Sequence, residues 1–466
     1  MNLSIAGNNK LSYGLLALML GFFISINLSK SPENSAHFID GDGSGHYAWL
    51  SAIFVHHSLD FKDVFEAEKS RKTIDYQGHN YHEINGITIN KFPPGTAFLI
   101  MPFFLMAMLI SMFAGLPIDG YSTVFQYSVG IAAVFWCWVG LLYLIRLLKS
   151  FDIGSNAALL FAGAALFGTN LFAYTFIMPS FSHVYSFSII SVLLYNVRRY
   201  FVCNNKRNLV FGALSLGLIF MIRPVNILVI FAIPFMADDR KMFKASVIAK
   251  FKSLDFLIAT VVLFLTVSPY LIINYLQTSQ LMYFAYKGEG FYWTRPELFN
   301  FLFSFRKGWL VYTPLFLLLF PAIIVTFKRN KFRFYWFLIF IFTLIYVFSS
   351  WWNWFYGDSF GMRPMVDFTS VFMVFIALLY KPLNNYFKKL IYIYILLVIS
   401  INFIQSYQYA RGIIHPDSMN KEAYFEVFLK TSEKYSGLIS GGPEYYFGKL
   451  ENKPFYSKEN NFEIDK

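Results

Sequence analysis

Long apolar runs separated by short polar stretches dominate this chain of 466 residues. About twenty apolar residues in a helix are enough to cross the hydrocarbon core of a bilayer. The runs therefore predict an all-α polytopic membrane protein. We expect about eleven transmembrane helices, near residues 11–29, 122–145, 156–175, 182–197, 208–222, 224–238, 254–273, 310–327, 334–351, 364–380 and 390–406.

One further apolar stretch, residues 95–116, decides the topology. If it lies in or dips into the outer interface, the loops rich in Lys and Arg all fall on one side, as the positive-inside rule requires. If it is a full span, every later basic loop faces the outside. Pro102 within the stretch, and Pro94 and Pro117 beside it, also favour a broken or interfacial helix. We expect a cytoplasmic amino terminus and an extracytoplasmic carboxyl terminus in the inner (cytoplasmic) membrane.

Composition excludes several classes of protein. Hydrophobic residues make up 56% of the chain, aromatic residues 21% and charged residues 14%, with a mean hydropathy of +0.48. A soluble protein needs more charge than this on its surface. The net charge of +12 does not indicate nucleic-acid binding, because the basic residues gather in short loops between apolar runs. No Gly-x-x-x-x-Gly-Lys sequence supports ATP-driven transport, and two cysteines indicate neither a disulfide framework nor a metal site.

The predicted outer side carries the large loops, so we expect any chemistry there. Residues 1–406 form the predicted transmembrane domain, and residues 407–466 form a short extracytoplasmic tail. The largest outer pieces are a first loop, 30–95, and a later loop, 274–309. We expect interfacial helices in the first loop.

The first loop has secondary-structure signals of its own. Apolar and polar residues are interspersed over 47–59, which is typical of a helix lying on the membrane surface. The stretch 73–90 carries Gln77-Gly78 and Asn85-Gly86, so we expect extended segments joined by tight turns.

Asp40-Gly41-Asp42-Gly43 follows the first predicted span. Two carboxylates at this depth are compatible with a catalytic base, with a loop that binds a divalent cation, and with a plain exposed turn. The sequence leaves the three open. His79-x-x-His82-Glu83 is a second place where a metal fits, although it lacks the His-Glu-x-x-His order of zinc proteases. We assign no metal ligands and no required cofactor, and leave a divalent cation open.

Cations on the predicted outer side are candidate phosphate ligands. Lys91 precedes Pro93-Pro94, and its compact ammonium can meet a lipid phosphate at headgroup depth or simply anchor the turn. Arg223 lies between two apolar runs, where a lone arginine normally faces the interior and pairs with an acid or a phosphate. Taken singly, each cation fits a structural ion pair, and taken together they favour an anionic ligand. The candidates are Lys91, Arg223, Arg295, Arg306 and Lys307.

The stretch 351–367 combines three tryptophans with polar and charged residues. Interfacial aromatic belts are routine in membrane proteins. Aromatic faces beside Asp, Asn and Arg also suit a sugar, since the rings stack and the polar edges bond. The predicted outer start of another helix carries a histidine that fits a structural role as well as a catalytic one. The candidate sugar or acceptor ligands are His183, Trp354, Tyr356, Asp358 and Arg363.

Several of these features together resemble a known family. An acidic residue shortly after the first helix, a Tyr47-Ala48 surface helix, the turn Lys91-Phe92-Pro93-Pro94 and about eleven spans are similar to the C-type membrane glycosyltransferases (GT-C). The nearest group contains bacterial aminoarabinose transferases and protein O-mannosyltransferases. The resemblance covers residues 10–410 in architecture, and its sharpest motifs lie in 38–50 and 90–95.

The resemblance implies roles for three residues. Asp40 or Asp42 would act as the base on the acceptor or bind it, and Lys91 would meet the carrier phosphate. Relatives carry an Asp-Glu pair close before the Tyr, whereas here Asp42 stands five residues before Tyr47 and no Glu follows it. This departure leaves Asp40 and Asp42 as alternative bases and the acceptor unassigned.

The predicted function is transfer of a sugar from an isoprenoid-phosphate carrier in the bilayer to a lipid, glycan or protein acceptor on the extracytoplasmic face. A transporter or flippase of lipid-linked glycans is an alternative, which should show charges near mid-membrane or inverted repeats. A non-catalytic membrane scaffold is a third.

Overall fold

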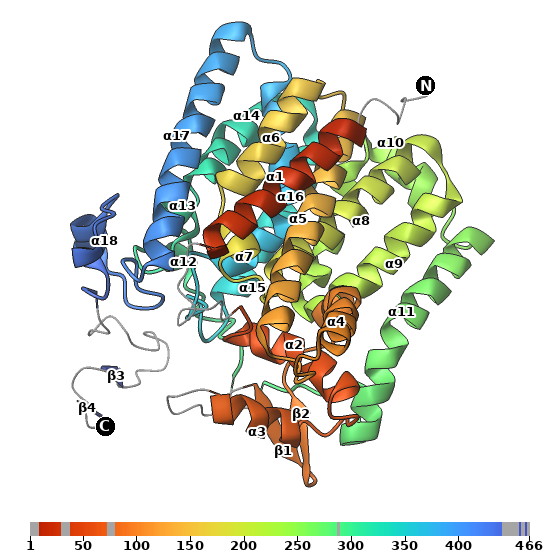
Figure 1. Ribbon diagram of the computed structural model, residues 1–466. Helices are drawn as coiled ribbons and strands as arrows, with labels where there is room; N and C mark the ends of the chain where they lie inside the picture. The colour runs from red at the N-terminus through yellow and green to blue at the C-terminus, as the bar shows by residue number, and fades with distance from the viewer. Residues whose placement is uncertain are drawn as a thin grey trace.

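The computed structural model describes residues 9–28, 38–71, 80–286, 289–439, 456–457 and 462–463, and this part of the chain is mainly helical (Figure 1). Its central helices pack in series, α1 on α5, α5 on α8, α8 on α9 and α9 on α11. The long helices are α1 (Asn9–Leu28), α4 (Gly95–Ala114), α5 (Thr123–Ser150), α8 (His183–Cys203), α9 (Lys206–Ile222), α11 (Leu254–Thr278), α15 (Lys331–Ser349) and α17 (Asn385–Ala410).

Six helical segments of the described chain are long and apolar enough to cross a membrane. They are α4, α5, α11, α15, the segment Arg363–Tyr380 and α17. Shorter apolar helices cover Gly14–Ser25, Ser155–Phe167 and Pro224–Met236. The prediction of a mainly helical, multi-pass membrane protein is confirmed, while the number of about eleven spans stays a prediction.

Some predicted spans are interrupted. The expected span 156–175 is divided into α6 (Ser155–Phe167) and α7 (Leu171–Phe176), and the side-chain amide of Asn402 donates to the carbonyls of Phe167 and Thr169 at the break. These bonds satisfy backbone groups that the interrupted helix leaves free. The prediction of one continuous helix over 156–175 was therefore wrong.

Proline interrupts the later spans. The expected span 310–327 becomes α13 (Trp309–Tyr312), the 3₁₀ segment η6 (Pro314–Leu318) and α14 (Leu319–Arg329), because Pro314 has no N–H and forces the residue before it to be extended. Similar 3₁₀ segments begin at or just before a proline. These are η3 (Pro224–Ala232), η4 (Pro234–Met236) and η7 (Arg363–Phe368), the last leading into α16 (Thr369–Tyr380).

The first loop folds into two helices and a hairpin. The helices are α2 (Asp42–Phe54) and α3 (Lys62–Arg71), and strands β1 (Tyr81–Ile84) and β2 (Ile87–Asn90) pair antiparallel. A helix is present here as expected, but α2 begins at Asp42 and not near Tyr47, and residues 43–52 are buried in the protein, so a position on the membrane surface stays a prediction. The hairpin turn is the expected Asn85-Gly86, with φ of 53° and 79°, and Gln77-Gly78 lies outside the described residues.

Residues 95–116 were expected to form a broken or interfacial helix, and the structure has helix α4 there. It is unbroken across Pro102, so a broken helix was wrong. In Figure 1 α4 is seen almost end-on, whereas α5, α9 and α11 are seen from the side, so α4 crosses the direction of the bundle. Its first residue, Gly95, touches the end of α9, where an added Cβ would lie 2.4 Å from the backbone of Met221 and Ile222. The interfacial position stays a prediction.

The basic loops meet at one end of the bundle, which we call the basic end. The guanidinium of Arg198 donates to the carbonyls of Ser150 and Met236. Arg333 pairs with Asp238, and Lys381 donates to the carbonyl of Phe151. Five loops that are far apart in sequence are therefore neighbours.

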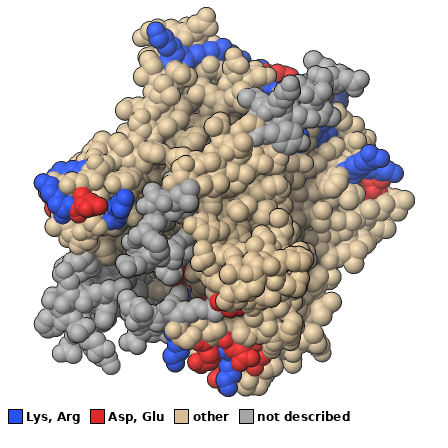
Figure 2. All heavy atoms as spheres, viewed as in Figure 1, with Lys and Arg blue, Asp and Glu red and all other residues tan. Residues whose placement is uncertain are grey.

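Charge on the visible face lies at its two ends and at its left and right edges. Figure 2 shows Lys and Arg at the upper end, mainly acidic side chains at the lower end near α3, mixed charges at the two side edges, and a broad central band that is almost free of charge. Such a band is what a bilayer requires of the surface that it surrounds. The lower end, with α2, α3 and the hairpin, is called the loop end below.

Smaller elements complete the described chain. At the basic end, α10 (Arg240–Phe243) continues into the π-helical segment η5 (Lys244–Ile248). The others are α12 (Leu298–Phe303), α18 (Lys421–Val427), the 3₁₀ turn η8 (Glu433–Tyr435) and the antiparallel strands β3 (Tyr456–Ser457) and β4 (Phe462–Glu463).

Candidate active site

Close packing fixes the start of α2 and with it Asp42. An added Cβ on Gly43 would lie 1.9 Å from Ser180 Oγ, and one on Gly45 would lie 2.4 Å from the ring of Phe92. The glycines therefore let α2 approach the turn before α8 and the Lys91-Phe92-Pro93-Pro94 turn. The glycines of this loop allow close packing against neighbouring segments. Asp42 is the first residue of the helix that packs there.

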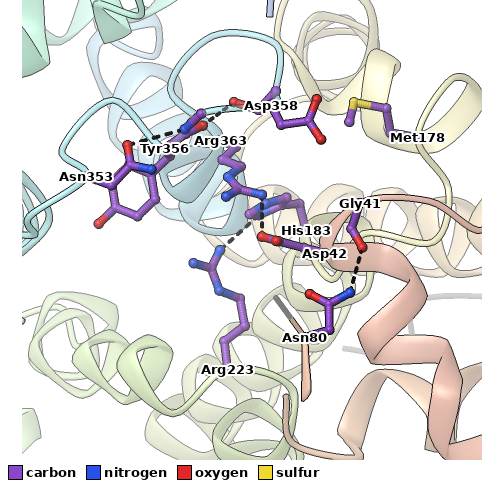
Figure 3. Close-up of polar contacts among 12 residues, drawn as sticks. Gly41, Asp42, Asn80, Met178, His183, Arg223, Asn353, Tyr356, Asp358 and Arg363 are labelled. Carbon is purple, nitrogen blue, oxygen red and sulfur yellow. Dashed lines mark hydrogen bonds and ion pairs between the residues drawn. The ribbon is translucent and has the colours of Figure 1, made fainter. Parts of the chain in front are cut away.

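Asp42 forms an ion pair with Arg363, the first residue of η7. Its Oδ2 lies 2.6 Å from Nη1 of Arg363, and the two side chains are 39% and 13% exposed (Figure 3). Burial opposes ionisation of Asp42, but the charges of Arg363, Lys91 and His46 outweigh it and lower the pKa of Asp42 to about 2. Asp42 is thus a carboxylate at neutral pH.

Arg363 retains bonding capacity beyond this pair. Its guanidinium lies 5.6 Å from the ring centroid of Phe181. Its Nε is buried and has no hydrogen-bond partner among the described residues. A buried donor of a charged group without a partner is costly, and an anionic ligand would satisfy it.

A buried network lies next to this pair, centred on Asp367 in η7. Asp367 Oδ1 accepts from Nδ1 of His183 at 2.7 Å, and Oδ2 accepts from Asn226 at 2.7 Å and from Arg223 at 3.2 Å. Arg223 Nη1 also lies 3.1 Å from His183 Nδ1. Because Asp367 is fully buried, these donors compensate a charge that water does not reach. In Figure 3 His183, Arg223, Arg363 and Asp42 converge from α8, the end of α9, η7 and α2.

Lys91 is paired at the loop end. Its ammonium contacts Oε1 of Glu289, and it lies 4.5 Å from the ring centroid of Tyr286. The indole of Trp352 donates to the other oxygen of Glu289 at 3.1 Å. The turn that carries Lys91 is tied to α2, since the indole of Trp49 donates to the Phe92 carbonyl at 2.8 Å. This hydrogen bond fixes the position of the Lys91 turn relative to α2, and so relative to Asp42.

Two further carboxylates lie near Asp42. Asp40 and Asp358 are both exposed, and Asp358 Oδ2 would lie 3.3 Å from a Cβ added to Gly41. Although Asp358 reaches solvent, the protein around its carboxyl displaces much of the water and raises its pKa, and the negative charges of Asp417, Asp40 and Asp42 raise it further. Asp358 also has a left-handed backbone, with φ of 51°. This region carries excess negative charge beside the cation of Arg363.

Other predicted ligands serve the surrounding structure. Arg306 donates to the carbonyl of Asp417 at 2.8 Å, and its guanidinium carbon lies 3.4 Å from the ring centroid of Phe355. Lys307 donates to the carbonyl of Ser359, and burial lowers the pKa of Lys307 to about 7. Both cations therefore support the loop that carries Asp358.

The aromatic candidates of this loop are largely enclosed. Trp354 is 5% exposed and Tyr356 is 8% exposed, and the Tyr356 hydroxyl donates to the carbonyl of Phe348 at 3.2 Å. Little of either ring is open to a sugar in this arrangement. Arg295 is exposed and has no ion pair with any residue that the structure describes.

No group of three or more potential metal ligands occurs within the described part of the chain. His82 and Glu83 lie on β1, and His79 is outside the described residues.

Sequence reasoning missed Asp367, Asn226 and Glu289. The signal for Asp367 was its place four residues after Arg363 at the start of an apolar run, where an acid needs a cation. Glu289 gave no comparable signal, because its loop is polar throughout.

The fold and its apolar helices define a multi-pass membrane protein with a polar cluster at its loop end. The fold is similar to that of the crystal structure of ArnT from Cupriavidus metallidurans bound to undecaprenyl phosphate, with a TM-score of 0.51 and 14% sequence identity. ArnT is an aminoarabinose transferase of the GT-C class. The match covers 87% of this chain and 66% of that one, so this chain spans just under two thirds of ArnT. No protein-family model matches the chain, and no curated protein matches it in sequence.

Proposed function

We propose that the protein transfers a sugar from an isoprenoid-phosphate carrier to an acceptor hydroxyl at the extracytoplasmic face of the inner membrane. The observation that carries the proposal is the Asp42–Arg363 ion pair, which joins α2 to η7 within an ArnT-like fold. A carboxylate and a cation side by side supply the two groups that such a transfer needs. One accepts a proton, and the other receives the leaving phosphate.

The reaction forms a bond from the acceptor oxygen to the anomeric carbon and breaks the bond from that carbon to the phosphate oxygen. The acceptor proton passes to a carboxylate, and the carrier leaves as an isoprenoid phosphate. In the proposal Asp40 or Asp42 is the base. General bases typically contribute about two to four powers of ten to such a step.

Arg363 links the two halves of the proposed reaction. It neutralises Asp42 before transfer, and at a pKa of about 2 this carboxylate is a weak base. Negative charge that builds on the leaving phosphate attracts the Arg363 guanidinium, which stabilises the leaving group. As Arg363 turns to the phosphate, Asp42 loses its main counter-charge and becomes more basic.

The other predicted cations have different places in the proposal. Lys91 reaches the carrier phosphate from the turn at the start of α4. Arg223 is tied to Asp367 and supports His183 and η7 from behind. The carrier's isoprenoid chain approaches through the bilayer beside α4.

Asparagine variants test the proposal, because Asn keeps the shape of Asp and removes its charge. Purified protein in lipid nanodiscs is given a panel of undecaprenyl-phosphate-linked sugars with a membrane lipid extract as acceptor, and release of undecaprenyl phosphate is measured. At least one of Asp40→Asn and Asp42→Asn should lose about a hundredfold or more in rate. Asp152→Asn, an exposed acid at the basic end that pairs with Lys381, is the matched control.

Binding of undecaprenyl phosphate separates loss of chemistry from loss of folding. Variants that bind this lipid as the wild type does, and prefer it to undecaprenol, are folded at the site. Near-normal turnover in both asparagine variants would contradict the assignment of Asp40 or Asp42 as the base. Equal affinity of the wild type for undecaprenol and undecaprenyl phosphate would contradict recognition of the carrier phosphate.

A further inference from the structure

A second cationic site lies at the basic end, far along the bundle from Asp42. A shallow, largely open surface hollow of about 640 Å³ is lined by Arg240, Lys241, Lys244, Ala245, Ile248 and Ala249. These six positions come in neighbouring pairs four residues apart, so they share one face of the α10–η5 helix. The proposed transferase chemistry uses none of them.

The opposite face of this helix is fixed to the protein. The ring of Phe243 lies 6.2 Å from that of Phe201 and 6.3 Å from that of Trp336. The carbonyl of Ser246 accepts from the hydroxyl of Tyr200 at 3.0 Å, and Ser246 is only 8% exposed. Packing on one side therefore presents the cationic side outward in a defined position.

The three cations of the hollow have no acidic partner in the described part of the chain. The nearby Asp238 is engaged by Arg198 and Arg333, and Asp239 caps α10 by accepting from the backbone of Met242 at 2.7 Å. Asp238 and Asp239 are therefore engaged within the protein, and the further acid of this corner is the exposed Asp255 in the first turn of α11. Net positive charge remains at the hollow and can be compensated from outside.

Exposed apolar side chains continue from the cations. Ile248 is 61% exposed, Phe251 is 70% exposed and Leu254 is 68% exposed. They lead into α11, in whose most apolar stretch only 6% of the residues are buried inside the protein. In Figure 2 Lys and Arg side chains also gather at the right-hand edge, where α10 leads into α11 in Figure 1. Charge followed by exposed apolar surface matches the order of a phospholipid, headgroup and then acyl chain.

We propose that this hollow binds an anionic phospholipid of the surrounding bilayer. The lipid phosphate contacts Arg240, Lys241 and Lys244, and the acyl chains run along Ile248 and the exposed side of α11. Basic segments at a membrane surface attract anionic lipids in this way. The site is separate from the proposed carrier site and does not depend on the proposed transferase activity.

The test compares lipids on delipidated, full-length protein by native mass spectrometry. The probes are dioleoyl phosphatidylglycerol, which is anionic, and dioleoyl phosphatidylcholine, which has no net charge. Each cation beside an anionic surface changes affinity by about fivefold. The variant Arg240→Gln/Lys241→Gln/Lys244→Gln should therefore bind phosphatidylglycerol at least about tenfold more weakly than the wild type, with binding of phosphatidylcholine unchanged.

The matched control is Lys328→Gln/Arg329→Gln/Lys331→Gln, which removes the same charge from exposed positions in another loop of the basic end. It should keep most of the wild-type affinity. Equal losses in both triple variants, or none in the first, would overturn the site. A second measurement uses the wild type alone: rising NaCl should release phosphatidylglycerol, and millimolar inorganic phosphate at constant ionic strength should not. Displacement by inorganic phosphate would mean a free-phosphate site in place of a lipid site.

Discussion

The two most telling charges of the loop end, Asp42 and Lys91, are both already paired, the first with Arg363 and the second with Glu289. An anionic ligand that reached either cation would exchange with a carboxylate of the protein. Such an exchange replaces one anion by another at the cation, and the displaced carboxylate of the protein then loses its counter-charge. Ligand affinity should therefore depend on the protein's own acids as much as on its cations.

Substitutions at Lys91 and Glu289 test this exchange. Lys91→Ala should weaken binding of undecaprenyl phosphate by about tenfold or more, since a charge-assisted contact is lost. Glu289→Gln should strengthen binding, because the competing charge disappears while Gln still accepts from Trp352. Affinity is measured on purified protein, with Glu426→Gln, an exposed acid paired with Lys430, as control. Unchanged affinity in both variants would make Lys91 a simple anchor of its turn.

Acid should weaken the Asp42–Arg363 pair over a defined range of pH. The pKa of Asp42 falls from 3.8 to about 2 on folding, so its contribution to stability is complete above about pH 4 and is lost as pH falls through 2. Asp42→Asn should lower the unfolding temperature at neutral pH and flatten its dependence between pH 4 and pH 2. The thermal midpoint of purified protein reports this. A variant with the same acid profile as the wild type would show that Asp42 does not gain charge stabilisation from folding.

At the scale of single residues, the sequence predicted the chemical type of an ion-pair partner better than it predicted which residue that partner is. Arg223 was expected to pair with an acid or a phosphate, and it pairs with Asp367, which lies 144 positions away along the chain. Lys91 and Glu289 are 198 positions apart. Partners at such separations are set by the packing of helices, which residue spacing does not encode. The glycines between Asp40 and His46 were likewise interpreted without the neighbours that explain them.

Among the elements, helices that face lipid were predicted best. Helix α11 begins at Leu254, where the predicted span 254–273 begins, because hydropathy alone defines a helix with little protein around it. The breaks at Thr169 and Pro314 were missed. Asn402 satisfies the first, and the hydroxyl of Tyr394 donates to the carbonyl of Pro314 at the second. Both partners come from α17, so neither break can be deduced from the local sequence.

Helix α2 offers a test of packing at this scale. Gly43→Ala would place a methyl group 1.9 Å from Ser180 Oγ, so α2 has to shift and carry Asp42 away from Arg363. We expect a loss of thermal stability and of activity, partly restored by Gly43→Ala/Ser180→Gly, which removes the two closest atoms. Gly163→Ala in α6 is the control, since nothing lies within 4 Å of its added Cβ. Wild-type behaviour of Gly43→Ala would show that this contact does not position Asp42.

For the whole molecule, the meeting of five basic loops at one end agrees with the distribution of charge from which the topology was predicted. Helix α17 begins next to Lys381 at that end, and Tyr409 near its other end packs on Phe360 with ring centroids 5.2 Å apart. Residue 410 therefore lies toward the loop end. The positive-inside rule predicts a cytoplasmic basic end and an extracytoplasmic tail, and this orientation stays a prediction.

Fusion reporters test this orientation. Alkaline phosphatase, which is active only outside the cytoplasm, should be active when fused after Lys466 and inactive when inserted in the loop after Lys381. A green fluorescent protein at the same two positions should give the opposite pattern. The reverse result at both positions would invert the molecule and move the polar cluster of Asp42 to the cytoplasmic face.

The Asp42–Arg363 pair joins residues 321 positions apart, and this separation has a consequence for biosynthesis. A ribosome delivers the chain from its amino terminus, so α2 emerges long before η7 has been made. Asp42 therefore lacks its ion-pair partner Arg363 until most of the bundle has been inserted. We expect that a chain truncated before η7 cannot assemble this site, so the site forms only after η7 has been synthesised and inserted.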